Sequence, residues 1–196
     1  KAARLLKHTS LELGGKSPNV VFDDADLEQA VFGAISGIFA ATGQTCIAGS
    51  RLLVQDSIHD AFVERLLEVA RTARMGDPMD TATQVGPVTT PPQFRKVLDY
   101  IDIARAEGAR VVLGGERGTA PECGQGWFVQ PTIFTDVRND MRIAQEEVFG
   151  PVLSVIRFKA EADALRIAND VRFGLAAAVW TRDIGRAIRM AERLQA

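Results

Sequence analysis

The stretch SPNVVFDDADLEQAVFGAISGIFAATGQTCIAGSRLLVQ, residues 17–55, decides the fold class. Ser17–Asp23 is a short apolar run that predicts a strand. A helix is predicted from about Leu27 to Ala41, and apolar residues nearly surround it, as in a buried helix. Gly43 ends that helix, and Arg51–Gln55 predicts a second strand. Continuous apolar strands that alternate with helices are typical of an α/β domain.

The rest of the chain continues this alternation. Apolar positions at helical spacing predict helices at Ser57–Arg74, about Pro92–Glu107, Glu161–Asn169 and from about Ile184 onward. Apolar runs predict strands at Thr9–Leu13, Arg110–Gly115, Gly126–Val137, Leu153–Phe158 and Leu175–Thr181. Pro131 indicates that its strand is an edge strand or is interrupted. The sequence therefore predicts an α/β fold with a mostly parallel sheet flanked by helices.

The composition is that of a globular domain. With 196 residues, 46% of them hydrophobic, the chain can bury the core of one domain. A net charge of −2 gives no electrostatic footprint for nucleic acid or for an anionic membrane. The longest weakly polar stretch, Ala30–Gly43, is shorter than the roughly 18–20 residues that a membrane span requires. We therefore expect no nucleic-acid partner and no membrane partner.

The cysteines and the first residue bear on the compartment. Cys46 and Cys123 lie far apart in dissimilar contexts, which favours a reducing compartment over a secreted disulfide scaffold. Cys123, in the loop PECGQG, is expected to be an exposed bystander. Lys1 opens a charged segment rather than a signal peptide, and the missing initiator methionine suggests a fragment or a processed chain. We expect a cytoplasmic protein.

Several common catalytic motifs are absent from the sequence. GGKS at Gly14–Ser17 resembles the end of a P-loop, but Ser10 stands where that motif needs a glycine. No G-x-G-x-x-G motif follows a strand, and no G-x-S-x-G elbow is present. The two histidines, His8 and His59, give no Cys–His metal spacing, so no metal site is expected. His59 falls in the first turn of an amphipathic helix, where we expect a solvated surface position.

What remains is a cysteine together with carboxylates. Cys46 follows an apolar helix in a glycine-flanked loop, where backbone N–H groups could point at a thiolate or an oxyanion. Free cysteines also act as small buried hydrophobes, so a structural thiol is the alternative. Glu12 interrupts an otherwise apolar strand, and a buried carboxylate there would suit a general base. Glu146 and Glu147 precede Phe149 at a loop-to-strand junction, where a solvated helix end is the alternative.

Four motifs, in this order along the chain, resemble one family. LELGGKSPNVVFDDADLEQAV (11–31), GQTCIAGSR (43–51), QEEVFGPVLSV (145–155) and FGLAAAVWT (173–181) closely resemble the catalytic domain of the NAD(P)-dependent aldehyde dehydrogenase superfamily. The resemblance covers essentially all of the chain and implies a Rossmann-like α/β fold. In the first motif Lys16 is then a structural turn residue rather than a Schiff-base lysine.

The resemblance implies a mechanism that agrees with the candidate residues. Cys46 matches the nucleophile, which attacks the aldehyde to give a thiohemiacetal whose oxyanion is held partly by the Cys46 backbone N–H. Hydride transfer to the nicotinamide then leaves a thioester. Glu12 matches the general base that activates water to hydrolyse this thioester, which favours a free carboxylic acid over a CoA ester as product. The implied substrate is a small-molecule aldehyde, and the implied cofactor is NAD or NADP.

The resemblance also assigns binding residues. Glu147 and Phe149 match the pair that positions the nicotinamide ribose and ring, since ribose hydroxyls prefer a carboxylate acceptor and an aromatic ring can support the nicotinamide. Gly14 lies near the base at the nicotinamide end of the site. Thr45 and Ile47 flank the nucleophile and are expected to wall the aldehyde tunnel.

The family pattern further implies that the chain is part of a longer protein. Residues 1–13 resemble the tail of the cofactor-binding domain, and residues 14–196 resemble a C-terminally incomplete catalytic domain. The main NAD(P) site lies outside such a chain, which is therefore expected to be inactive alone as a dehydrogenase. The full-length parent is expected to be a homodimer or homotetramer. Two alternatives are an NAD-independent thiol esterase that uses Cys46 and Glu12, and a non-catalytic scaffold or interface module with a buried structural cysteine.

Overall fold

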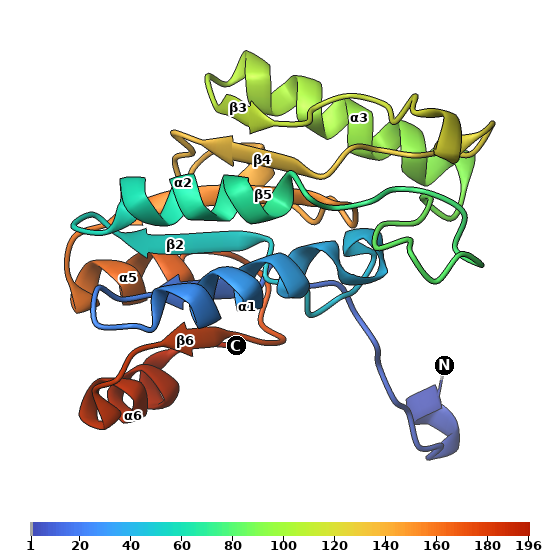
Figure 1. Ribbon diagram of the computed structural model, residues 1–196. Helices are drawn as coiled ribbons and strands as arrows, with labels where there is room; N and C mark the ends of the chain where they lie inside the picture. Colours follow the sequence, from blue (N-terminus) through green and yellow to red (C-terminus); the bar gives the residue numbers. More distant parts are fainter. Residues whose placement is uncertain (1) are drawn as a thin grey trace.

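The chain folds around one six-stranded sheet that is mostly parallel (Figure 1). The computed structural model describes residues 2–196. The strands are β1 Pro18–Val21, β2 Arg51–Gln55, β3 Arg110–Leu113, β4 Thr132–Thr135, β5 Val152–Phe158 and β6 Ala178–Trp180. Their order across the sheet is β3-β4-β5-β2-β1-β6, and neighbouring strands are parallel except for the antiparallel pair β3 and β4. The predicted α/β fold is confirmed.

Helices cover both faces of the sheet. The helices are α1 Leu27–Phe39, α2 His59–Ala70, α3 Pro91–Ala106, α4 Arg142–Gln145, α5 Glu161–Asn169 and α6 Ile184–Arg193, with short 3₁₀ turns at Ala2–Leu5, Ala40–Gly43 and Pro121–Cys123. Leu52 and Val54 of β2 pack with α1 and α2, whereas Leu53 between them packs on the opposite face with residues of α3 and α5. Successive strand residues point to opposite faces, so a strand buried on both faces is apolar throughout.

The predicted strand at Thr9–Leu13 is wrong. These residues form no strand, and they lead away from the sheet toward an N-terminal turn that stands apart from the body of the molecule (Figure 1). Leu11 and Leu13 are 74% and 65% exposed. An apolar run becomes a strand only when a neighbouring strand completes its hydrogen bonds, and among residues 2–196 none pairs with this segment.

Two boundary predictions also need correction. The predicted helix Ser57–Arg74 is observed at His59–Ala70, and Ser57 does not cap it because its hydroxyl donates to Asp23 instead. The predicted strand Gly126–Val137 is reduced to β4, which begins directly after Pro131. Since β4 lies between β3 and β5, Pro131 marks an interruption and not an edge.

Two residues that we expected at the surface are buried. His59 is 4% exposed because it lies on the same helix stripe as Phe62, Val63 and Leu66, which faces the sheet. Cys123 is 3% exposed, and its thiol packs against the turn at Gly118, where an added Cβ would lie 3.4 Å from Sγ. The loop around Cys123 therefore folds back onto the domain.

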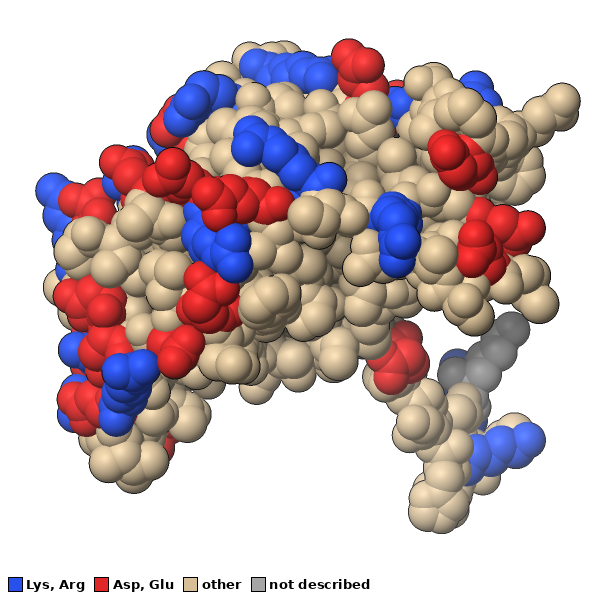
Figure 2. Space-filling model, in the orientation of Figure 1, with Lys and Arg blue, Asp and Glu red and all other residues tan. Residues whose placement is uncertain are grey.

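One face of the molecule and the lengths of its helices bear on possible partners. Acidic and basic side chains are interspersed on the face drawn in Figure 2, without a broad basic area. Between residues 2 and 196, no helix combines the length and the apolar character that crossing a membrane would take. That part of the chain also holds no group of three or more His, Cys, Asp or Glu residues arranged to bind a metal ion.

Candidate active site

Loops that precede three neighbouring strands form the candidate site. The Gly14–Ser17 segment leads into β1, the Gln44–Ser50 loop leads into β2, and the Glu146–Pro151 segment leads into β5. Because β5, β2 and β1 are adjacent and parallel, their amino ends meet at one edge of the sheet. The fold therefore brings together motifs that lie more than a hundred residues apart in the sequence, as the 132-residue separation of Gly15 and Glu147 illustrates.

The Gly14–Gly15 turn joins the cysteine loop to the glutamate loop. The Gly15 N–H donates a hydrogen bond of 2.9 Å to Glu147 Oε1. A Cβ on Gly15 would lie 2.3 Å from the Cys46 carbonyl oxygen, and a Cβ on Gly14 would lie 2.5 Å from Glu147 Oε2. Both distances are far below van der Waals contact. At Gly15 the obstacle is backbone, so the approach requires glycine there, whereas a side chain at Gly14 would displace the Glu147 carboxylate. The sequence indicated Gly14 but missed Gly15, whose backbone holds the site together.

Cys46 and Glu12 lie near enough to one another for the Glu12 carboxylate to influence the thiol. Cys46 is a free, partly buried thiol. A hydrogen bond with the Glu12 side chain raises the pKa of the Cys46 thiol above its ordinary value, and desolvation and the negative charge of Glu12 raise it further. The backbone N–H groups of Ile47 and of Cys46 itself lower the pKa because they stabilise the thiolate. The two residues that the sequence singled out for catalysis are thus brought together.

The expectation that Glu12 is buried within a strand is wrong. Glu12 is exposed, since the segment that carries it leaves the sheet and is not covered by any element of residues 2–196. A water-accessible carboxylate beside a thiol can still accept a proton from water, which is the chemistry required of a general base.

The raised pKa of Cys46 beside Glu12 predicts a pH shift in the reactivity of the thiol. Only the thiolate reacts rapidly with iodoacetamide, and a raised pKa moves thiolate formation to higher pH. Replacing Glu12 with glutamine removes the negative charge, so the midpoint of the alkylation profile should move to lower pH. Measuring the alkylation rate against pH in the wild type and in Glu12→Gln tests this, with Cys46→Ala giving the background. An identical midpoint in both proteins would show that Glu12 does not control the thiol.

The two residues beside the nucleophile differ in exposure. Thr45 is half-buried and its carbonyl accepts the Ala48 N–H at 3.1 Å, which closes a tight turn around Cys46. Ile47 is 56% exposed and presents an apolar side chain next to the thiol. The turn thus places one small polar and one apolar side chain where a bound molecule would approach Cys46.

Glu146 and Glu147 have different surroundings. Glu146 binds Arg142 and the Tyr100 hydroxyl, and these hydrogen bonds lower the pKa of Glu146 to about 2. It is therefore part of a surface ion-pair network, as the solvated-helix-end alternative supposed. Glu147 instead turns toward the Gly14–Gly15 segment, with Oε1 on the Gly15 N–H and Oε2 over Gly14. Of the two acids, Glu147 belongs to the candidate site.

Phe149 is held in a conformation that non-glycine residues rarely adopt. Its φ is +58°, in the left-handed region. The Gln93 side-chain amide donates to the carbonyl oxygens of Val148 and Phe149 at 2.8 and 2.9 Å, which fixes this backbone. Such strain persists only where the surroundings enforce it, and it is common at functional sites. Gln93, on α3, was not indicated by any sequence motif.

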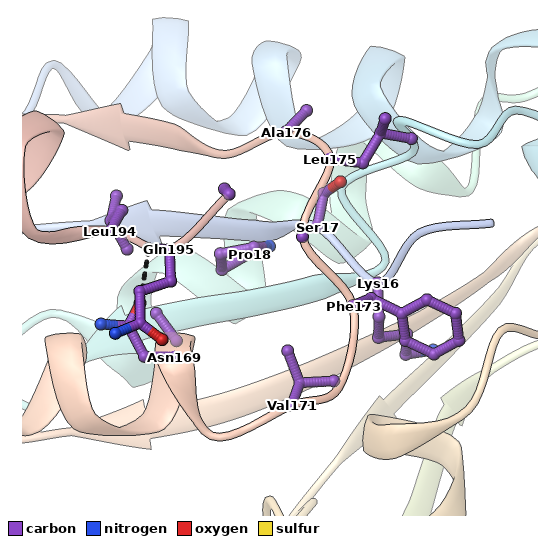
Figure 3. A pocket seen from close by; sticks show the side chains of 13 residues that line it. Lys16, Ser17, Pro18, Asn169, Val171, Phe173, Leu175, Ala176, Leu194 and Gln195 are labelled. Carbon is purple, nitrogen blue, oxygen red and sulfur yellow. Dashed lines mark hydrogen bonds between the residues drawn. The ribbon is translucent and has the colours of Figure 1, made fainter. Parts of the chain in front are cut away.

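A buried arginine anchors the amino ends of β1 and β2. Arg51 is 0% exposed, and its guanidinium donates to the carbonyls of Lys16 (3.0 Å), Ile167 (3.0 Å) and Ala168 (2.7 Å). Lys16 is also buried, and desolvation lowers the pKa of its amine to about 7. Lys16 and Phe173 line a small cavity of about 10 Å³ beside β1 (Figure 3). The Lys16 carbonyl thus helps Arg51 to hold the segment that leads into β1.

Gly43 fits the cysteine loop against the loop before β5. Its φ is +68°, and an added Cβ would lie 2.0 Å from the Gly150 carbonyl oxygen.

Gly43→Ala should lower the free energy of unfolding by about 2–6 kcal/mol, because backbone strain and steric overlap add. Gly37→Ala is the matched control, since Gly37 lies in α1 with nothing within 4 Å of an added Cβ. We expect that variant to gain about 0.5–1 kcal/mol. Urea unfolding measures both, and equal stabilities would contradict the close approach.

The amino-acid sequence of the chain is similar to those of known proteins over its whole length. A model of the aldehyde dehydrogenase family matches residues 1–196. Betaine aldehyde dehydrogenase of Mesorhizobium japonicum is 50% identical over 195 residues, which are 100% of this chain and 40% of that protein. An aldehyde dehydrogenase of Emericella nidulans is 49% identical over 191 residues, covering 97% of this chain and 38% of that protein. The chain therefore spans about two fifths of the length of these relatives.

Solved structures agree with the observed fold. A crystal structure of betaine aldehyde dehydrogenase from Staphylococcus aureus in complex with NAD+ superposes with a TM-score of 0.95 at 45% identity, covering 98% of this chain and 38% of that one. The likeness therefore extends over nearly all of the described sheet and helices.

Proposed function

The chain belongs to the aldehyde dehydrogenase family, and from that premise we propose that its complete protein oxidises a small aldehyde to a carboxylic acid with NAD(P)+ as hydride acceptor. The observation that supports this most directly is the proximity of Glu12 to Cys46, whose thiol pKa it raises, beside the edge of the sheet where Gly14 and Glu147 meet. A nucleophile and a base within reach of one another are the two protein groups that the reaction needs.

In this proposal Cys46 forms the first covalent bond. Its thiolate sulfur attacks the aldehyde carbon, the carbonyl electron pair moves to the oxygen, and a thiohemiacetal oxyanion results. The N–H groups of Cys46 and Ile47, which stabilise the free thiolate, are placed to stabilise negative charge at this position. A bound nicotinamide would supply the acceptor for the hydride of the former aldehyde carbon, and Cys46 would then carry the acyl group as a thioester.

Glu12 then acts on water. Its carboxylate takes a proton as the water oxygen attacks the thioester carbon, the carbon–sulfur bond breaks, and Cys46 leaves as the thiolate. The acid is released, and Glu12 passes its proton to solvent, to which it is exposed. Its solvent exposure suits this role, since both the attacking water and the released proton need a path to bulk solvent.

The residues at the sheet edge fit a nicotinamide cofactor. Glu147 Oε1 is occupied by the Gly15 N–H, while Oε2 lies over Gly14, where the missing Cβ leaves the carboxylate accessible as an acceptor for ribose hydroxyls. Phe149, fixed by Gln93, can support a flat ring. We assign Glu147, Gly14 and Phe149 to cofactor binding, and Thr45 and Ile47 to the wall of the aldehyde site.

The same premise leads to proposals about the whole protein. We assign residues 1–13 to the end of a cofactor-binding domain and residues 14–196 to the catalytic domain. Relatives named betaine aldehyde dehydrogenase make betaine aldehyde the first substrate to test. Homo-oligomers and inactivity of the isolated chain as a dehydrogenase remain part of the proposal. A thiol esterase activity is a second candidate, because ester hydrolysis would use Cys46 and the nearby Glu12 but would need no hydride acceptor.

The test is NAD(P)H formation by the complete protein with a panel of aldehydes that includes betaine aldehyde. Substrate-dependent NAD(P)H with equimolar carboxylic acid supports the proposal. Hydrolysis of an activated ester without NAD(P)H from any aldehyde would favour the esterase. Absence of both activities, together with a Cys46 inert to iodoacetamide, would favour the scaffold alternative.

A further inference from the structure

The chain between α1 and Cys46 passes through three consecutive residues in the left-handed region. Ala41, Thr42 and Gly43 have φ of +50°, +58° and +68°. Glycine adopts this region readily, whereas a residue with a branched Cβ, such as threonine, is an outlier there. Such a conformation persists only where surrounding contacts enforce it, and it is common at functional sites. The contacts that enforce it therefore bear on the loop that carries Cys46.

Two side chains tie this segment to the loop before α3, which passes beside it (Figure 1). Thr42 is 4% exposed, and its hydroxyl donates to the Gly86 carbonyl oxygen at 3.2 Å. Two residues later, the Gln44 side-chain oxygen accepts from the Thr89 N–H at 3.0 Å and from the Thr89 hydroxyl at 2.8 Å. The partners are 44 and 45 positions apart in the sequence, so these bonds are tertiary contacts and not part of the turn itself.

The turn that carries Cys46 is held at both of its ends. It begins at the tethered residues Thr42 and Gln44, and it returns to α1 where the Gly49 N–H donates to the Gly37 carbonyl oxygen at 3.0 Å. Cys46 lies four residues after Thr42 and two after Gln44. A shift of the left-handed segment would therefore move the sulfur as well.

The reactivity of Cys46 depends on where its sulfur lies. The nearby Glu12 carboxylate raises the pKa of the thiol, and the N–H groups of Ile47 and Cys46 lower it. Those N–H groups belong to the turn and move with it, whereas Glu12 lies on a different segment of the chain. A shift of the turn would thus change the influence of Glu12 first. In the proposed reaction, a misplacement of about 1 Å can lower the rate about 100-fold.

We propose that Thr42 is a positioning residue for Cys46. Its buried hydroxyl, bonded to the Gly86 carbonyl, holds the left-handed segment Ala41–Gly43 in place. The turn that follows then carries the sulfur to its position near Glu12. The effect of Thr42 on turnover rests on the proposed dehydrogenase function, whereas its effect on the thiol does not.

The first test is the rate of alkylation of Cys46 by iodoacetamide against pH in the complete protein, which requires neither aldehyde nor cofactor. Thr42→Val keeps the branched shape of the side chain and removes the hydroxyl bond. Because the turn is then free to move away from Glu12, the midpoint should shift to lower pH by about 0.5–1 pH unit, toward that of Glu12→Gln. In the Glu12→Gln background, Thr42→Val should cause no further shift.

Two control variants separate positioning from stability. Thr42→Ser keeps the hydroxyl and should retain the wild-type midpoint. Thr72→Val removes a hydroxyl that donates to the Val69 carbonyl oxygen at 2.8 Å, beyond the end of α2, and it should leave the midpoint unchanged. A thermal unfolding curve for each variant shows that its profile is recorded on folded protein.

The second test is turnover by the complete protein. Thr42→Val should lower kcat about 10- to 100-fold and leave the KM for NAD(P)+ within about twofold of wild type. The cofactor residues Glu147 and Phe149 are held by Gly15 and Gln93 instead, so their positions should not change. If the wild type forms no NAD(P)H from any aldehyde, the proposed function fails, and the alkylation profile alone decides the role of Thr42.

An unchanged midpoint in folded Thr42→Val would overturn the inference, and so would an equal shift in Thr42→Ser. If Thr42→Val does not fold, Thr89→Val decides instead, because Thr89 is exposed and its variant loses only the hydroxyl bond to Gln44. A midpoint at lower pH in Thr89→Val supports the inference, and an unchanged midpoint rejects it.

Discussion

Replacing Cys46 with alanine should abolish NAD(P)H formation by the complete protein. Loss of a covalent nucleophile removes the step on which all later steps depend, and we expect the rate to fall on the order of 10⁴–10⁶-fold. Cys46 lies in an open turn between half-buried Thr45 and exposed Ile47, so the smaller side chain leaves no large cavity. The measurement is the steady-state rate with saturating aldehyde and cofactor, accompanied by a thermal unfolding curve.

The other cysteine supplies the matched control. Cys123 is buried (3% exposed) beside Gly118, and it lies far along the chain from the candidate site. Cys123→Ala should lose some stability through the lost contacts of its sulfur and keep wild-type turnover. Retention of activity in Cys46→Ala, or equal loss in both variants, would remove Cys46 from the chemistry and leave the structural-thiol alternative.

Replacing Glu12 with glutamine should separate the two halves of the reaction. Acylation of Cys46 does not require the base proposed for hydrolysis, so the variant should release about one NAD(P)H per active site and then stall. We expect steady-state turnover to fall about 10²–10⁴-fold, the usual contribution of a positioned general base. Rapid mixing with detection of NAD(P)H measures the burst, and mass spectrometry should find the acyl group on Cys46.

Glu192→Gln is the control for the change of charge. Glu192 is exposed on α6 and lies outside the candidate site, so this variant should show no stall. If Glu12→Gln turns over at the wild-type rate, another group activates the water. If it shows neither burst nor turnover, Glu12 acts before the thioester forms.

Local sequence patterns predicted the interior of the fold well. Arg51–Gln55 and Glu161–Asn169 were predicted with their observed bounds, because a strand buried on both faces and a helix with one apolar stripe each leave a strong periodic signal. The pattern failed at Thr9–Leu13, which has the composition of a strand but no partner among the described residues. Strand formation depends on a neighbour that the local sequence does not reveal.

Side-chain environments were harder to predict than elements. His59 was expected at the surface because of its residue type, although its spacing from Phe62, Val63 and Leu66 already placed it on the buried stripe. For His59, helical periodicity is therefore a better predictor of burial than residue type. Glu12 was expected to be buried, and that error followed directly from the wrong strand.

The candidate site was predicted by motif resemblance more than by physics. Cys46 and Glu12 belong to separate motifs, and only the structure brings them near one another. Gly15 and Gln93 were missed because their roles are made by the fold: one depends on the approach of two loops, and the other on the position of α3 under Phe149. No short motif reports such long-range contacts.

The sheet order has a consequence for how the chain reaches its native state. β1 pairs with β6, joining residues 19–21 to residues 178–180, so almost the whole chain must be ordered before this ladder closes. Contacts between distant segments require the loss of loop-closure entropy before their own stabilisation is gained, and they therefore slow folding. The Gly15–Glu147 hydrogen bond likewise joins residues that are 132 positions apart in the sequence. The proposed catalytic activity should therefore be among the last properties to return during refolding. A partly synthesised chain that ends before residue 147 would also lack Glu147, the carboxylate that we propose binds the cofactor.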